Sequence, residues 1–352
     1  MRPRFWLLPV AVLLVGVIAF FVGKMTGAGS LNRAVQSDYC YMAFVKGLPS
    51  RDGLEGGKYL SILNLKTKKY LALSRMWDDG KFSVSPDGSI YYGTVLGTIN
   101  VIDCRKREER VVVKMSPFAI NPACSPNGKS IVFEGKTRDV RGIRDIIKAD
   151  SDGRNVVGLT NGRAFCGSPC WSPDGRNLAY DMTVSGGKFS VWTMAADGRD
   201  QKPLVVIDGS NVQRPAWSPN GKWIAFQNDR DGNYSIYAVE LSRDLRPKRI
   251  VEVAKDGFEN KNPSWSADGR KIFYQSKRPA ETLFGLLVWD FDLFEKDFDP
   301  NFPSDPVMIS KNYFDEELPA AYPLPIKDGS IDLLDYLLPG ITLISDSTAG
   351  GI

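Results

Sequence analysis

The most informative feature of this 352-residue sequence is a missing side chain, because it contains no histidine. Imidazole is the commonest general base near neutral pH and a frequent metal ligand. Its absence excludes Ser-His-Asp triads, Cys-His dyads and HExxH zinc sites. The sequence also lacks a GxGxxG fingerprint, a phosphate-binding P-loop and a CxxCH haem-attachment motif. Nucleotide and c-type haem chemistry therefore have no support.

A strong excess of one charge is also missing. The 45 basic and 41 acidic residues are interleaved and give a net charge of +4. No large field of one sign is therefore expected to attract nucleic acid. The densest basic run, RKREER at residues 105–110, contains two glutamates and is interpreted as a solvated hairpin tip. We expect no nucleic-acid partner.

The longest uncharged stretch lies at the N-terminus. Residues 5–22, FWLLPVAVLLVGVIAFFV, are just long enough to span a bilayer as a helix. Arg2 and Arg4 precede them, so the positive-inside bias predicts a cytoplasmic N-terminus and a periplasmic or extracellular remainder. The sequence thus predicts a single-pass signal anchor within residues 1–30 and a cell-membrane location. Secretion after signal-peptide cleavage at the small residues TGAGS is the alternative.

Cysteine is scarce. The five cysteines, all of which would be exported, are Cys40, Cys104, Cys124, Cys166 and Cys170. Cys166 and Cys170 are close enough in sequence for a local disulfide, and buried thiols are the other interpretation. A metal site at this CxxxC pair would need further ligands, which must be carboxylates because histidine is absent. We expect no metal there.

One sequence unit recurs along the chain. Alignment on a turn glycine gives five good copies: KFSVSPDGSIYY, NPACSPNGKSIVF, SPCWSPDGRNLAY, RPAWSPNGKWIAF and NPSWSADGRKIFY. Their glycines, spaced 40 to 48 residues apart, are Gly88, Gly128, Gly175, Gly221 and Gly269. A degenerate sixth copy, YPLPIKDGSIDLL, contains Gly329. This spacing is typical of four-stranded propeller blades.

Each part of the unit has a physical role. Serine, proline and Asp-Gly or Asn-Gly are the residues of a tight turn. Apolar residues alternate after the turn, which predicts a strand, and second hairpins lie between successive units. We therefore predict an all-β, six-bladed β-propeller of four-stranded blades at residues 31–337, between the N-terminal transmembrane helix and a C-terminal tail at 338–352.

The order of the hairpins predicts how the ring closes. The chain opens with outer strands near residues 59–73 and ends with inner strands near 319–335. The first and last segments must then share a blade, which removes free sheet edges. The strand-like residues 38–45 are a further candidate for that blade, and the sequence does not decide which segment supplies its second strand.

The PxWSPDGxxIAF units, each followed by an IY strand and a DxxGxxxxLT hairpin, resemble the TolB-like, WD40-like propeller repeat over about residues 38–337. The resemblance implies the fold, whereas function must be argued from sites. We expect the chain not to be TolB itself, which has a sizeable domain before its propeller. Prolyl-oligopeptidase-type enzymes also contain related propellers, but this sequence has neither a GxSxG elbow nor a histidine.

The repeat also gives candidate binding residues. The position before the conserved proline, or its equivalent, is expected at the mouth of the central channel. It is occupied by Lys81, Asn121, Ser168, Arg214, Asn262 and Tyr322. One hypothesis is a polar ring in which Lys81 and Arg214 hold a small anion or a peptide terminus. Alternatively, these are solvated loop residues.

A long insertion provides a second candidate surface. Residues 289–306, WDFDLFEKDFDPNFPSDP, combine carboxylates with aromatic rings. The candidates for partner docking are Phe291, Asp292, Phe294, Asp297, Phe298 and Asp299. Calcium binding is an alternative, although the spacing fits no EF-hand loop. Simple decoration of a blade edge is the third interpretation.

These features predict a membrane-anchored, extracytoplasmic propeller that acts as a protein-interaction or scaffold module in a cell-envelope complex. We expect protein partners, no catalytic residues and no cofactor. One alternative is a propeller that binds a small ligand or acts as a metal-dependent hydrolase or lyase, and another is a propeller that binds polysaccharide through exposed aromatic residues. No ring of acidic residues appears at the aligned positions to favour the first of these.

Overall fold

The structure is a computed structural model. It describes residues 41–48, 57–64, 70–76, 81–94, 96–103, 108–115, 118–136, 143–160, 162, 164–183, 187–281, 287–301, 304–308 and 316–321. The predicted anchor and C-terminal tail lie outside these ranges. Among the described residues there is no helix with the length and apolar character needed to cross a membrane.

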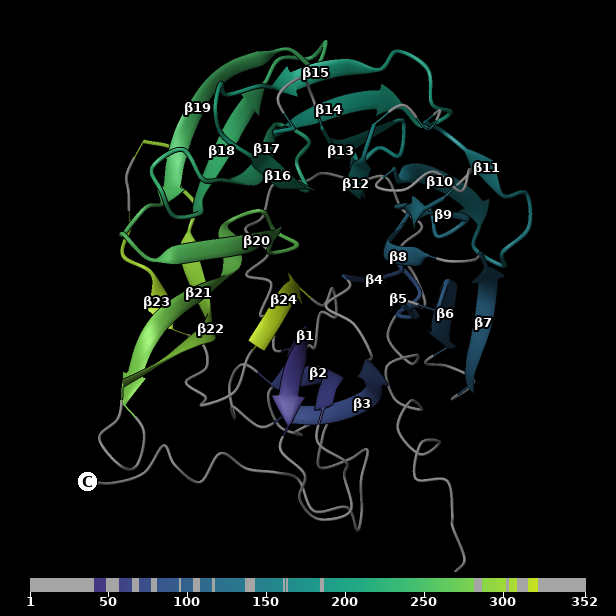
Figure 1. Cartoon of the computed structure of the whole chain (residues 1–352), viewed down its shortest axis with the longest axis horizontal. Helices are drawn as coiled ribbons and strands as arrows, with labels where there is room; N and C mark the ends of the chain where they lie inside the picture. Colours follow the sequence, from purple (N-terminus) through teal and green to yellow (C-terminus); the bar gives the residue numbers. More distant parts are fainter. Residues whose placement is uncertain are drawn as a thin grey trace, which may run out of the picture.

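Every named element is a β-strand, and the strands pair antiparallel within their sheets. The sheets stand around a central axis like the blades of a propeller (Figure 1). The predicted all-β propeller fold with four-stranded sheets is confirmed for the described part of the chain. Within each set of four strands, the strands lie side by side from the central axis to the rim (Figure 1).

The first and last described strands share one sheet. Its strands, in the order β24-β1-β2-β3, are β24 (Glu316–Ala321), β1 (Tyr41–Leu48), β2 (Gly57–Asn64) and β3 (Tyr70–Met76). The predicted pairing of the two ends of the chain is thus confirmed. It also answers the open question, because β1 lies between β24 and β2 and is the second strand. The turn unit around Gly329 lies outside the described residues.

The next two sets of strands are joined. The first set is β4 (Phe82–Val84), β5 (Ile90–Thr94), β6 (Thr98–Asp103) and β7 (Glu108–Lys114). The second set is β8 (Ala119–Cys124), β9 (Ser130–Gly135), β10 (Asp145–Asp150) and β11 (Val157–Gly158). A single pairing, Thr94 with Ala119, links them into an eight-stranded sheet. A Cβ on Gly93 would lie 2.4 Å from the Ala119 carbonyl oxygen, so glycine permits this close approach.

Three further four-stranded sheets complete the described fold. They contain β12 (Cys166–Trp171), β13 (Asn177–Thr183), β14 (Phe189–Ala195), β15 (Lys202–Val205), β16 (Val212–Trp217), β17 (Trp223–Asn228), β18 (Ser235–Leu241), β19 (Pro247–Ala254), β20 (Glu259–Trp265), β21 (Lys271–Glu281), β22 (Leu287–Asp297) and β23 (Val307–Met308). Each follows the order of the chain from the axis to the rim.

The predicted tight turns are present. In the turn between β12 and β13, Gly175 has a φ of +70°, and its amide donates to the Ser172 carbonyl oxygen at 2.9 Å. The Asn177 amide donates to the Ser172 hydroxyl at 2.9 Å, and the Arg176 amide donates to the Asp174 carboxylate at 3.0 Å. The same pattern recurs at the other units, which explains why Ser, Asp or Asn, and Gly are repeated.

The second strand of each repeated unit is buried on both faces. Ile131 and Phe133 in β9 are fully buried, and so is Val132, which points the opposite way. The same holds for Leu178, Ala179 and Tyr180 in β13, and for Ile224, Ala225 and Phe226 in β17. Each sheet is packed between two neighbours, and the core therefore consists of apolar layers between successive sheets.

The first half of the predicted docking loop is a strand, which corrects that prediction. Residues 287–297 form β22, paired with β21. Phe294 is buried and stacks on Tyr274, with ring centroids 5.9 Å apart. Phe298 packs edge-on against Trp223 and Trp265. Because both rings fill the core, neither can anchor a partner.

The remaining docking candidates give no continuous surface. Asp297 is exposed and lies 3.5 Å from the Lys271 amine, and the exposed Asp299 accepts a hydrogen bond from the Asn301 amide. The side chains of Phe291 and Asp292 lie outside the described part of the structure. The insertion is thus mainly an extension of the hairpin formed by β21 and β22.

The predicted local disulfide is also corrected. Cys166 and Cys170 are free thiols at the two ends of β12. Four residues of extended strand separate two positions by roughly 13 Å, whereas a disulfide requires Cα atoms closer than about 7 Å. Cys166 is buried, as the alternative interpretation expected.

Candidate functional site

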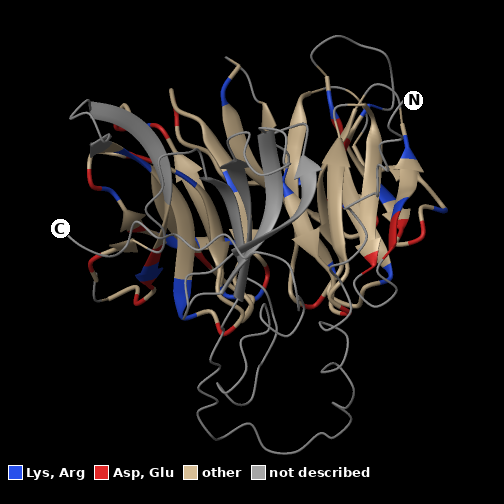
Figure 2. Cartoon of the chain, turned by 90° about the horizontal axis from the view of Figure 1, so that it is seen from below, with Lys and Arg blue, Asp and Glu red and all other residues tan. Residues whose placement is uncertain are grey.

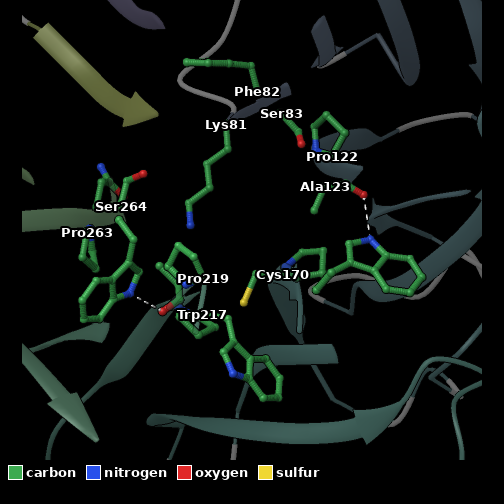
Figure 3. Close-up of a pocket in the computed structure, with 16 residues that line it drawn as sticks. Lys81, Phe82, Ser83, Pro122, Ala123, Cys170, Trp217, Pro219, Pro263 and Ser264 are labelled. Atoms are coloured by element: carbon green, nitrogen blue, oxygen red, sulfur yellow. Dashed lines mark hydrogen bonds between the residues drawn. The ribbon is translucent and has the colours of Figure 1, made fainter. Parts of the chain in front are cut away.

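A cavity of about 270 Å³ lies on the central axis, where the inner strands converge (Figure 3). The equivalent short segment of four inner strands, β8, β12, β16 and β20, forms most of its wall. These segments are Pro122-Ala123, Pro169-Cys170-Trp171, Pro215-Ala216-Trp217 and Pro263-Ser264-Trp265. The rest of the wall consists of Lys81, Phe82 and Ser83 at the start of β4, together with Pro219 and Asn262. The cavity is therefore mainly apolar, with few polar groups.

The indole rings attach neighbouring sheets to one another. The Trp171 indole donates to the Ala123 carbonyl oxygen of the preceding sheet at 3.0 Å, and the Trp265 indole donates to the Ala216 carbonyl oxygen at 3.0 Å (Figure 3). The Trp217 indole instead bonds within its own turn, to the Gly221 carbonyl oxygen at 3.2 Å. Two of the three rings thus hold the wall of the cavity rigid.

Lys81 is the only charged residue in the described wall of the cavity. Its side chain extends into the space, toward the side where Cys170 and Pro219 lie (Figure 3). Burial, and to a smaller extent the positive charge of Arg214, lowers the pKa of this amine to about 8. The nearby carboxylates of Asp181 and Glu134 oppose that shift. The amine is thus charged at neutral pH at an electrostatic cost.

Four of the six predicted ring residues lie inside strands, not in loops, and Lys81 directly precedes β4. Asn121, Ser168, Arg214 and Asn262 all have left-handed backbones, with φ values of 52°, 48°, 57° and 53°. Each falls at a register shift in its inner strand, directly before the proline. A non-glycine residue in this conformation costs roughly 1–2 kcal/mol. The surroundings must therefore compensate for four strained positions.

At three of the four positions a hydrogen bond to the preceding sheet provides this compensation. The Ser168 amide donates to the Glu134 carboxylate at 2.6 Å, and the Arg214 amide donates to the Asp181 carboxylate at 3.0 Å. In the next sheet the Asn262 amide donates to the Gln227 side-chain oxygen at 3.0 Å. We call these three bonds the inter-sheet latches.

The sequence analysis missed the latch acceptors. Each acceptor follows the buried aromatic residue of a second strand, as in Phe133-Glu134, Tyr180-Asp181 and Phe226-Gln227. A polar residue that recurs in an otherwise apolar strand was the available signal. In β5 the aligned position is Gly93, and β5 pairs with β8 there instead.

Two latch acceptors are buried carboxylates of adjacent sheets. Glu134 also accepts from the Asn121 amide group and pairs with Arg144 at 3.1 Å. Burial and the negative charge of Glu134 raise the pKa of Asp181, and Arg214 and Lys81 oppose this. A Cβ on Gly167 would lie 2.9 Å from Asp181 Oδ1 and 3.0 Å from Glu134 Oε1, so this glycine leaves room for both carboxylates.

The structure brings only part of the predicted polar ring to the cavity. Lys81 and Asn262 line it, whereas Asn121 and Ser168 are buried and do not line it. Arg214 is half-buried, and its Nη1 atom is buried without a hydrogen-bond partner. Tyr322 lies outside the described residues.

The chemistry of the cavity favours binding over reaction. Burial raises the pKa of the Cys170 thiol to about 11 although Lys81 lowers it, so the thiol is protonated and a weak nucleophile at neutral pH. Within the described ranges, no three Cys, Asp or Glu side chains are grouped closely enough to hold a metal ion. The carboxylates of Glu134 and Asp181 are occupied by latch bonds.

Comparison with known proteins gives matches to parts of this chain. Residues 136–283 match the family model of the TolB beta propeller domain. A stretch of 108 residues is 31% identical to dipeptidyl-peptidase 5 of Porphyromonas endodontalis and covers 30% of this chain and 15% of that protein. Another of 105 residues is 34% identical to the Tol-Pal system protein TolB of Francisella tularensis subsp. tularensis and covers 29% and 23%. The matches thus span less than a quarter of either relative.

A solved structure extends the likeness to most of the fold. The crystal structure of TolB from Acinetobacter baumannii is similar with a TM-score of 0.62 and 19% sequence identity, over 80% of this chain and 66% of that one. The sheet arrangement and the latched inner strands define a β-propeller. The structural likeness shows the fold, and the match of residues 136–283 to the TolB beta propeller domain agrees with the TolB-like repeat that the sequence predicted.

Proposed function

We propose that this chain is a membrane-anchored, six-bladed, extracytoplasmic propeller that binds a protein partner of a cell-envelope complex at its central channel. The observation that carries the proposal is the rigid apolar wall of prolines and indoles around the cavity. Aromatic side chains in such clefts are typical anchors of protein interfaces.

The wall of the cavity is rigid for two reasons, and this rigidity supports binding. Proline fixes φ at each inner strand, and the Trp171 and Trp265 indoles are held by carbonyl groups of the preceding sheets. A site that is already ordered loses little conformational entropy when a partner binds. Trp217, which bonds only within its own turn, is the ring with most freedom to contact a partner.

The surface outside the channel is less suited to a specific partner. Figure 2 shows basic and acidic residues side by side at the ends of the strands. The exposed apolar side chains, such as Val111, Val157, Ile250 and Val307, are distributed over the outer strands of different sheets. No described patch outside the channel therefore combines area with apolar character.

The remaining parts of the proposal rest on the sequence. The apolar residues 5–22 support the anchor and export, and the sixth turn unit supports six blades. The TolB relatives are named as members of a multi-protein system, which supports an envelope complex. We propose no enzymatic activity and no cofactor, since the carboxylates beside the channel are occupied by latches.

Site-specific photocrosslinking in the native membrane tests this proposal. A benzoylphenylalanine in place of Ser264, which lines the cavity, is expected to give one discrete adduct with a partner protein. The same group in place of Arg243, on an exposed outer turn, is the matched control. No adduct at position 264, or an equal adduct at position 243, would contradict a channel-binding partner.

A calcium requirement is tested separately. Because no described acidic cluster fits an ion, the thermal unfolding midpoint of the purified protein should be the same in calcium and in EDTA. A midpoint raised by calcium would show that a calcium site exists and would contradict the cofactor-free proposal.

A further inference from the structure

Lys81 places one amine in a cavity whose described wall has no other charged group. The base of its side chain is held in place, because the Lys81 backbone amide donates to the Asn121 side-chain oxygen at 2.7 Å. From there the methylene groups carry the amine into the space between the prolines and indoles (Figure 3). The amine takes part in none of the ion pairs found among the described residues. It is therefore an unpaired group, anchored at its base, that faces a cavity.

The wall offers this amine no counterion. No acidic side chain is among the residues that line the described part of the cavity. Asp181 and Glu134 act on the amine without lining the cavity, and both carboxylates accept inter-sheet latches. An ammonium group that is partly desolvated by prolines and indoles, without a partner, is costly. A reaction that removes its charge is therefore favoured in this cavity.

The amine is also more reactive than the thiol in the same wall. Burial and, to a smaller extent, Arg214 lower the pKa of the Lys81 amine to about 8. About a tenth of it is then uncharged at pH 7, against roughly one part in a few thousand for an ordinary lysine. The Cys170 thiol, whose pKa burial raises to about 11, is almost wholly protonated. Desolvation in an apolar pocket is one of the ways in which proteins activate a lysine as a nucleophile.

We propose that the Lys81 amine binds a small apolar aldehyde reversibly as an imine. The uncharged amine attacks the carbonyl carbon, a nitrogen–carbon bond forms, and one amine proton passes to the carbonyl oxygen. The hydroxyl group then leaves with the second amine proton as water, and the carbon–nitrogen double bond is completed. Since an imine is a much weaker base than an amine, the product loses the charge that the cavity disfavours. Hydrolysis reverses both steps and releases the aldehyde unchanged.

The cavity also limits the kind of aldehyde. A volume of about 270 Å³ is at the lower end for ligand pockets, which suits a molecule built on one ring or a short alkyl chain. The indole of Trp217, which bonds only within its own turn, can stack on an aromatic ligand. The aldehyde needs only Lys81 and the wall of the cavity, so this inference does not rest on a protein partner.

Trapping with a hydride donor tests the site in the full-length protein. The probe is benzaldehyde. Sodium cyanoborohydride delivers hydride to the imine carbon while the nitrogen takes a proton, which leaves a stable benzyl amine that peptide mass spectrometry locates. Lys222, on an exposed turn of the same protein, is the internal control. We expect Lys81 to be benzylated at least tenfold faster than Lys222, at a rate that saturates as the benzaldehyde concentration rises.

Competition separates binding in the cavity from simple reactivity. Benzyl alcohol has nearly the shape of benzaldehyde but no carbonyl group, so it should slow benzylation of Lys81 at least threefold and leave Lys222 unaffected. Lys81→Met should lose the fast adduct, and Lys222→Met should keep it. Equal rates at the two lysines, a rate at Lys81 that does not saturate, or no effect of benzyl alcohol would overturn the proposal.

Discussion

Lys81 occupies an environment that disfavours its charge. Burial, and then Arg214, lowers the pKa of the amine to about 8 from 10.5 in the unfolded chain. Both states are charged below pH 8, so the native state carries the full penalty there. As pH rises from 8 to 10.5 the native state loses its proton first, and the penalty disappears. The lysine therefore destabilises the protein at neutral pH.

Replacement of this lysine should accordingly stabilise the fold. We expect Lys81→Met to raise the free energy of unfolding by about 2 kcal/mol at pH 7, since one pKa unit corresponds to about 1.4 kcal/mol and the amine is partly exposed. Denaturant titrations should show the gain shrink between pH 8 and 10.5. Lys222→Met is the control, and a variant less stable than the wild type at pH 7 would contradict this account. Cys170, Asp181, Glu134 and Arg214 are the other ionisable groups that face the amine.

Gln227 tests the latches at the scale of one residue. Gln227→Leu leaves the Asn262 amide without its acceptor while Asn262 keeps a left-handed backbone. A buried donor without a partner costs about 1–3 kcal/mol, and we expect that loss in the free energy of unfolding. Gln227→Glu keeps an acceptor and, at a pH low enough to protonate the new carboxyl so that no charge is buried, should be close to the wild type. Similar losses in both variants under that condition would argue against the latch.

At the scale of the element, β5 and β8 depend on one glycine. Gly93→Ala places a Cβ 2.4 Å from the Ala119 carbonyl oxygen and 2.5 Å from the Ile120 Cα atom, and neither backbone atom can rotate away. Overpacking of this kind typically costs about 1–3 kcal/mol. In Gly135→Ala the new Cβ meets the end of the Ile147 side chain, which can change rotamer, so a smaller loss is expected in thermal unfolding. A larger loss for Gly135→Ala would show that the strand pairing at Gly93 is not the limiting contact.

The elements that sequence predicts well are those defined by their own residues. The turn at Ser172 and Gly175 follows from local backbone preferences, and the alternation after it predicts β13. The latches could not be found this way, because donor and acceptor lie more than 30 residues apart in different sheets. Likewise, the alternating carboxylates and rings of residues 289–298 favoured a surface loop, yet only the neighbouring sheet shows that Phe294 and Phe298 are core residues.

At the scale of the whole molecule, the two ends of the chain support each other. Without β24, β1 becomes an unpaired edge, and such edges promote aggregation. A chain that ends at Asp315 should therefore unfold with lower cooperativity and aggregate, whereas one that ends at Ala321 keeps β24 and should not. Light scattering during thermal unfolding compares the two, and identical behaviour would mean that the β24 pairing contributes little.

The sheet formed by β24, β1, β2 and β3 can be completed only late in the synthesis of the chain. β1 and β2 are made near the start of synthesis, but β24 follows only after about 250 further residues. At about 5–20 residues per second the ribosome needs roughly tens of seconds to deliver it. During that interval one side of β1 lacks its neighbour. An exported nascent chain would therefore need a holding chaperone, or a delay in the folding of its first sheet, until its end has emerged.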